Sequence, residues 1–195
     1  MAPNLIKFST VAILASVVVA ALTGCTINVG AAEPSAKHGM MGHNANSSEY
    51  SATEIMFAQM MIPHHQQALE MSSLAESRAV NKDVKRLAAE IAAEQAPEIT
   101  MFEQWLEQAG ASTMMDHDMG KDGMLSEEQM KQLEASTGLE FEKLFLEGMI
   151  LHHKGAIDMA QMIQDSSNAE VKSLANSIID SQSSQITYME SLLAK

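Results

Sequence analysis

Cysteine is almost absent from this chain, because Cys25 is the single one among 195 residues. It follows an apolar stretch near the N-terminus, at the position where a bacterial lipoprotein carries its lipid. With that thiol lipidated, no cysteine remains. Disulfide bonds and thiolate metal sites are therefore excluded for the rest of the chain.

Basic residues are also scarce. The chain has 12 Lys and Arg against 25 Asp and Glu, which gives a formal net charge of −13. This balance disfavours nucleic acid and anionic lipid as partners, and it is compatible with cation binding. The motif Glu-x-x-His, which di-iron four-helix bundles need in two helices, is missing as well. Its absence argues against a ferritin-type oxidase.

Residues 1–24 are predicted to be a lipoprotein signal peptide. Lys7 supplies the positive region, an apolar run follows, and the segment ends in Leu22-Thr23-Gly24-Cys25. Cleavage before Cys25 and lipidation of its thiol would anchor the protein. The alternative is an uncleaved anchor helix, since the apolar run approaches the length that spans a bilayer. Either interpretation places the remainder outside the cytoplasm, at the cell surface or in the periplasm.

Two segments follow the predicted signal. Residues 25–50 are rich in Ala, Gly, Ser and Asn and show no helical or strand period, so they are expected to form a flexible tether that contains Met and His. Residues 51–195 suit one domain with its own core.

A Met/His motif occurs twice in this domain, and its copies begin 88 positions apart, at Met61 and at Met149. Each copy keeps Met, His-His, Ala and Met at the same spacing. After a one-residue slip the similarity continues at an offset of 87, as in the pairs Asn81 and Asn168, Val84 and Val171, and Gln95 and Gln182. Each half is about fifty residues of related pattern, which fits a helical hairpin.

The apolar periodicity predicts an all-α fold with helices over 53–78, 82–109, 138–165 and 168–194. Ser51 offers a capping box to the first helix, and a short helix is expected after Ser126. The first hairpin (53–109) and the second (138–194) are joined by a long crossover over 110–137. Two related hairpins joined in this way indicate a four-helix bundle of ferritin-like layout. Pro63 and Pro97 fall inside predicted helices, where we expect kinks rather than breaks.

The motif residues share one helical face with small alanines, and this face should point toward the bundle axis. The predicted metal ligands are Met61, His64, His65, Met71, Met149, His152, His153 and Met159. Thioethers and imidazoles together favour Cu(I), with Ag(I) as a mimic, and the imidazoles also give access to Cu(II). An imidazole with its ordinary pKa of about 6.5 predicts that Cu(II) affinity falls steeply below about pH 6.

The motif has a purely structural alternative. Met at helical spacing is common core filler, and a lone buried His is usually a packed one. Two adjacent histidines flanked by Met, occurring twice, favour metal, although the pattern leaves open which histidine of each doublet binds. Glu94, Glu98 and Asp180 are candidates for partners of the histidines, but a solvated helix face is the favoured interpretation for them.

Two further Met/His clusters lie in glycine-rich segments, where Met has no packing role. They are predicted to be accessory capture sites for the same metal. Their residues are His38, Met40, Met41 and His43 in the tether, and Met114, Met115, His117, Met119 and Met124 in the crossover.

The motif resembles that of the bacterial "domain of unknown function 305" family. The resemblance is carried by Met61-Ile62-Pro63-His64-His65 with Ala68 and Met71, by the segment from Phe145 to Ala160, by Gly123-Met124-Leu125-Ser126-Glu127, and by Gly138 with Phe141. It covers residues 50–194. The resemblance implies an exported, ferritin-like four-helix bundle, and some members of the family bind copper and support copper tolerance.

The sequence therefore predicts a lipid-anchored, copper-binding protein outside the cytoplasm that sequesters copper or hands it over to an unknown transfer partner. It is not expected to be an enzyme. Two alternatives stay open: a copper-dependent oxidase-type metalloenzyme, and a structural or adhesion module that holds no metal.

Overall fold

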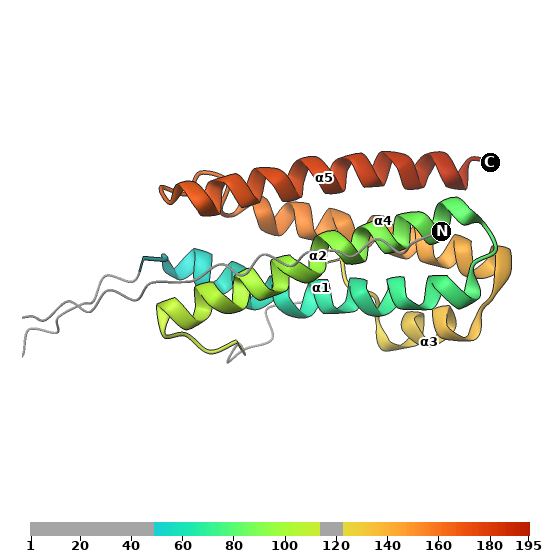
Figure 1. Cartoon of the computed structure of the whole chain (residues 1–195), viewed down its shortest axis with the longest axis horizontal. Helices are drawn as coiled ribbons and strands as arrows, with labels where there is room; N and C mark the ends of the chain where they lie inside the picture. Colours follow the sequence, from blue (N-terminus) through green and yellow to red (C-terminus); the bar gives the residue numbers. More distant parts are fainter. Residues whose placement is uncertain (1–48, 114–122) are drawn as a thin grey trace, which may run out of the picture. The chain divides into compact units, whose positions relative to one another are not determined.

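The computed structural model describes residues 49–113 and 123–195, and these ranges contain five α-helices and no strand. The helices are α1 (Ala52–Arg78), α2 (Lys82–Ala109), α3 (Glu127–Ala135), α4 (Gly138–Gln161) and α5 (Ala169–Leu193) (Figure 1). The predicted all-α fold is confirmed. The third long helix, α4, was predicted to end at residue 165 from its apolar periodicity. It ends four residues earlier, at Gln161, and residues 162–165 form turns.

Local signals explain where the helices begin. Ser51 and Ser126 each form a full capping box, at the starts of α1 and α3. Asn81 and Asn168, which match in the repeat, cap α2 and α5 with their side-chain oxygens. Helices α1 and α2 continue through their internal prolines. Both prolines are exposed, so each missing N–H faces the outside of the bundle.

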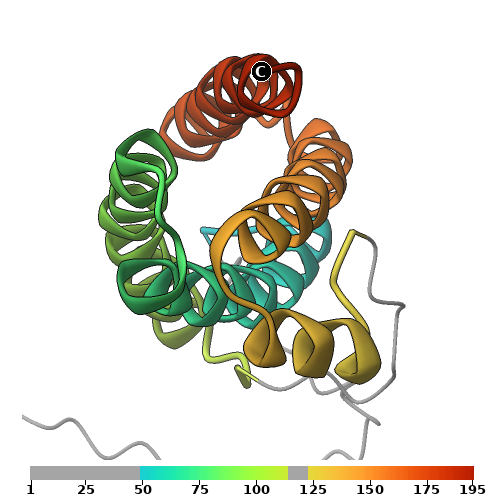
Figure 2. The same ribbon diagram turned by 90° about the vertical axis from the view of Figure 1, so that its right-hand side faces the viewer.

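The four long helices form a ring when seen end-on, in the order α1, α2, α5, α4 (Figure 2). Helix α2 packs on α1, α5 packs on α4, and α1 packs on α4, while α3 lies outside the ring against α1 and α4. The two hairpins therefore meet mainly through α1 and α4, the helices that carry the repeated motif. None of the helices in the described ranges has the length and apolarity needed to cross a membrane.

Two matched glutamates tie the hairpins together. Glu54, buried in α1, accepts a hydrogen bond from the Ser166 hydroxyl in the turn between α4 and α5. Glu142, buried 88 positions later in α4, accepts hydrogen bonds from the backbone N–H groups of Val80 and Asn81, at 2.7 and 2.5 Å. Each hairpin's turn is thus held by a carboxylate from the other hairpin, and hydrogen bonds to charged groups are among the stronger ones.

The end of the crossover is fixed against both central helices. The Gln67 side chain of α1 donates to the Leu125 carbonyl and accepts from the Leu125 N–H, at 2.9 and 2.7 Å. Gly123 has a positive φ of 76°, and a Cβ there would lie 2.7 Å from the Leu151 carbonyl oxygen of α4. Only glycine allows so close an approach of the chain to the helix.

The apolar core is divided into two clusters. One contains Met71 and Met149 and lies toward the α1–α2 turn, with Phe141 and Phe145. The other contains Met61 and Met159 and lies toward the opposite end. The buried residues between these clusters along the four long helices include all four motif histidines and two glutamines, Gln95 and Gln182. The bundle therefore has a polar layer at its middle.

Candidate metal centre

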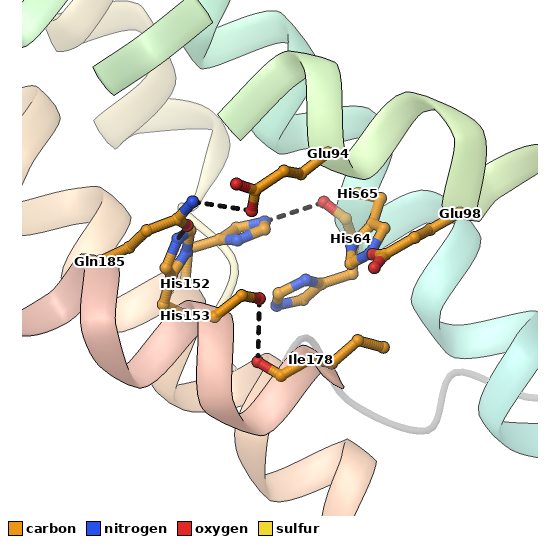
Figure 3. A network of polar contacts seen from close by, with 9 residues as sticks. His64, His65, Glu94, Glu98, His152, His153, Ile178 and Gln185 are labelled. Carbon is orange, nitrogen blue, oxygen red and sulfur yellow. Dashed lines mark hydrogen bonds and ion pairs between the residues drawn. The ribbon is translucent and has the colours of Figure 1, made fainter. Parts of the chain in front are cut away.

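The four motif histidines are fully enclosed. His64 and His65 of α1 and His152 and His153 of α4 are each at most 1% exposed. They face one another because the repeat places each doublet on the inner side of its helix, and α1 packs on α4. Figure 3 shows the four histidines together, with Glu94 and Glu98 of α2 and Gln185 of α5 around them.

His64 and His152 form the centre of the layer. Their ring centroids are 3.6 Å apart and their planes are inclined by 35°. The Nε2 atom of His152 lies 2.8 Å from the backbone carbonyl oxygen of His64. A carbonyl only accepts, so Nε2 of His152 carries the hydrogen and donates it. In the neutral ring the lone pair is then on Nδ1.

His65 and His153 flank this centre and have matched partners. Nε2 of His65 lies 2.7 Å from a carboxylate oxygen of Glu98, and Nε2 of His153 lies 2.6 Å from Oε1 of Gln185. The Gln185 amide nitrogen donates to Glu94 at 2.8 Å, which identifies Oε1 as the acceptor. Both imidazoles therefore donate through Nε2, so the lone pair of each ring in its neutral form is on Nδ1.

Three of the four Nδ1 atoms have no hydrogen-bond partner among the residues that the structure describes. They belong to His65, His152 and His153, and all three are buried. A buried polar atom without a partner costs free energy. A ligand bound to such an atom would remove this cost. Because their Nε2 atoms already donate, these rings present basic nitrogens inside a closed layer. This is the arrangement that orients histidine ligands in metal sites.

Burial keeps the imidazoles of His152 and His153 neutral. The pKa of His152 falls to about 3, mainly because burial penalises the charged ring, with His153 lowering it further and the His64 carbonyl opposing the shift. The pKa of His153 falls to about 4, again mainly through burial, while the hydrogen bond to Gln185 opposes the shift. The expectation of proton competition near pH 6 is therefore wrong for this pair, because it assumed solvated rings.

The four motif methionines are buried in pairs on the two sides of the layer. Met71 and Met149 belong to the cluster toward the α1–α2 turn, and Met61 and Met159 to the other. The pairing crosses the repeats because α1 and α4 run in opposite directions, so the start of one motif meets the end of the other. The thioethers flank the histidines from both ends and do not form one group with each other.

Metal ligands other than Met do not gather into a preformed cage. In ranges 49–113 and 123–195, no three His, Cys, Asp or Glu side chains are grouped so that they could hold one metal ion. A hard cation that needs several oxygen or nitrogen ligands therefore has no ready site there. An ion that accepts few ligands, and accepts thioether sulfur, fits the donor set better.

Sequence reasoning undervalued the side chains behind the histidines. Glu98 was expected to lie on a solvated face, yet it contacts His65, and its side chain is 17% exposed. Gln185 was not considered, although it matches Glu98 at the offset of 87. The repeat could have identified Gln185. It occupies the same position relative to His152 and His153 as Glu98 does relative to His64 and His65. Asp180 is exposed, as expected.

Gln95 and Gln182 were also overlooked. Each is 2% exposed and interrupts an apolar stripe of isoleucines at the same place in its hairpin. Each lies one turn before the side chain that contacts a histidine, Glu98 or Gln185, so both belong to the polar layer. Both side-chain atoms of Gln95 and Oε1 of Gln182 lack a hydrogen-bond partner within the described part of the chain.

Most of the accessory residues lie outside the described ranges. These are His38, Met40, Met41, His43, Met114, Met115, His117 and Met119, and the predicted lipidation site, Cys25, also lies outside these ranges. Met124 is described and is partly buried, beside the close contact of Gly123 with α4.

The fold and the layer define a class of protein, a ferritin-like helical bundle with histidines buried at its middle and methionines on both sides. The chain belongs to the family of the domain of unknown function DUF305, whose family model matches residues 54–193. The resemblance inferred from the doubled motif is thereby confirmed. A comparison with curated proteins finds no match.

Solved structures of the family are similar to this chain. A DUF305 protein from Streptomyces coelicolor, described as a presumed secreted protein, is 34% identical, with a TM-score of 0.69 over 73% of this chain and 92% of that one. A DUF305 fragment from Deinococcus radiodurans is 30% identical, with a TM-score of 0.68 over 74% and 97%. CopM in its Cu(I)-bound form is 29% identical, with a TM-score of 0.61 over 73% and 96%.

Proposed function

We propose that this protein is a copper-binding protein outside the cytoplasm, anchored by lipid at Cys25, that sequesters Cu(I) or Cu(II) or hands it over. The proposal rests on the buried Nδ1 atoms of His65, His152 and His153, which have no hydrogen-bond partner in the described chain. The Nε2 atom of each ring donates a hydrogen bond that fixes the orientation of the ring. No three of the described His, Cys, Asp or Glu side chains are grouped to hold one ion, so a bound ion would take one or two of these nitrogens together with sulfur from the motif methionines.

Ligand chemistry favours copper over other ions. Thioether sulfur is a soft ligand and imidazole a borderline one, and this combination suits Cu(I), with Ag(I) as its mimic. Zinc rarely uses Met. The relatives give independent support, since CopM has been solved in Cu(I)-bound, Cu(II)-bound and Ag-bound forms. The acidic net charge of −13 is compatible with a cationic cargo.

The proposed location rests on the N-terminal signal and on a relative that is described as a presumed secreted protein. We expect Cys25→Ser to release the protein from the membrane fraction or to leave it unprocessed, with copper binding unchanged. The N-terminus of the mature wild-type protein is the direct test. A soluble mature form that begins at a residue other than Cys25 would show that lipid anchoring is wrong.

The function is tested by the metal content of the protein after expression in copper-supplemented medium. Replacing His64 and His65 by Ala, or His152 and His153 by Ala, should abolish the tightest Ag(I) and Cu(I) binding, or halve it if each repeat holds its own ion. Replacing His38 and His43 is the matched control, which should remove only weaker equivalents. The composition of the tether predicts a flexible segment, and the entropy cost of ordering such a segment on binding would weaken its sites.

Helix content by circular dichroism must accompany the titrations, because four histidines at most 1% exposed also contribute to packing. If the motif variants remain helical and bind metal as the wild type does, the histidines are a structural core and the proposal is wrong.

A further inference from the structure

The two halves of the layer differ at one matched position. In the first repeat the carboxylate of Glu98 contacts His65 at 2.7 Å. In the second repeat the neutral amide of Gln185 contacts His153 at 2.6 Å. These two side chains match at the offset of 87, so the same hydrogen bond is made in both halves by groups of different charge.

The carboxylate that is linked to His153 lies one hydrogen bond further out, behind Gln185. Gln185 donates to Glu94 at 2.8 Å, and Glu94 is exposed on α2. The Glu98 side chain is 17% exposed and touches its imidazole directly. A carboxylate behind a ligating histidine makes that ligand more basic and compensates the charge of the bound ion. Both effects are stronger inside a protein than in water.

Gln185, the partner of His153, also lies on a different side of the four-helix ring from Glu98. Gln185 and Glu94 bridge α2 and α5, which are not among the helix pairs that pack closely. Two more side-chain hydrogen bonds cross this side, from Arg86 to Tyr188 at 2.7 Å and from Trp105 to Glu170 at 3.4 Å. Glu98, by contrast, reaches His65 within the closely packed pair α1 and α2.

We propose that the two repeats are unequal binding halves: the first, with Glu98 behind His65, retains the ion, and the second, with Gln185 behind His153, exchanges it. Opening the second half requires the loss of side-chain hydrogen bonds between α2 and α5, and α1 and α2 stay packed. Glu98 and Gln185 are positioning residues, since each acts through its histidine. The inference rests on the proposed metal binding and adds that the cation is bound unequally.

The test uses the mature chain, ¹⁵N-labelled at histidine and titrated with Ag(I) while the imidazole signals of His65 and His153 are followed separately. In the wild type the His65 signal should saturate first. Glu98→Gln should weaken that response by about 10- to 100-fold, the usual effect of removing such a partner. Glu103→Gln, the same change at an exposed site of α2, is the control and should have no effect.

A double exchange provides the converse test. Glu94→Gln with Gln185→Glu keeps the total charge and moves the carboxylate directly onto His153, with an amide at position 94 to donate to it. In this variant His153 should saturate together with His65 or before it. Equal saturation in the wild type, or an unchanged order in both variants, would refute the inequality. No response of any of the four buried imidazoles would instead refute the proposed function.

Discussion

Replacing Gln95 by Met should stabilise the metal-free protein. Gln95 is 2% exposed, and both of its amide atoms lack a partner in the described chain. An unsatisfied buried polar group costs about 1–3 kcal/mol, and Met has nearly the same length with no hydrogen-bonding group to satisfy. The helix propensities of Gln and Met are nearly equal, so the change acts through burial alone. Because 1 kcal/mol shifts Tm by roughly 2–4 °C in a domain of this size, Tm should rise by several degrees.

The assay is thermal unfolding followed by circular dichroism in the presence of a chelator. Gln104→Met is the control, because Gln104 is exposed on the same helix and should change Tm little. A lower Tm for Gln95→Met than for Gln104→Met would show that the amide is satisfied by ordered water. The Gln95 amide would then belong to a completed hydrogen-bond network and would have no donor or acceptor left for a ligand.

Three other outcomes follow from the same contacts. Because burial lowers the pKa of His153 to about 4 and of His152 to about 3, the Ag(I) response of these two imidazole signals should change little between pH 7 and 5, measured by ¹⁵N titration. The unfolded chain takes up these protons near pH 6.5, so the unfolding free energy should fall as pH drops from about 6.5 toward 4, by roughly 3 kcal/mol for His153 alone, in urea titrations. Glu142→Ala leaves two backbone N–H groups of the α1–α2 turn without their acceptor and should cost about 1–3 kcal/mol in the same assay.

The helices and their pairing were predictable because the signals are local or repeated. Ser51 and Ser126 mark helix starts by their capping boxes, and the repeat shows that two hairpins share one design. Burial of the doublets followed from placing them on one face of each helix. The close approach of Gly123 to α4 was not predictable, since it depends on how the crossover packs.

The partners of the histidines were harder to predict. Glu98 is one of several glutamates on α2, and composition alone makes a solvated face the reasonable expectation. Only the relative placement of α1 and α2 shows that its carboxylate meets Nε2 of His65. The lowered pKa of His153 likewise depends on burial by the surrounding helices, and the apolar periodicity of one helix does not predict that burial.

The most direct measurement is the ¹⁵N spectrum of the histidine side chains with and without one equivalent of Ag(I). The buried motif histidines should show large shifts at Nδ1, while Nε2 of His65, His152 and His153 remains protonated and bonded to its present acceptor. Unchanged Nδ1 signals of these rings, with His38 and His43 responding first, would contradict metal binding in the buried layer.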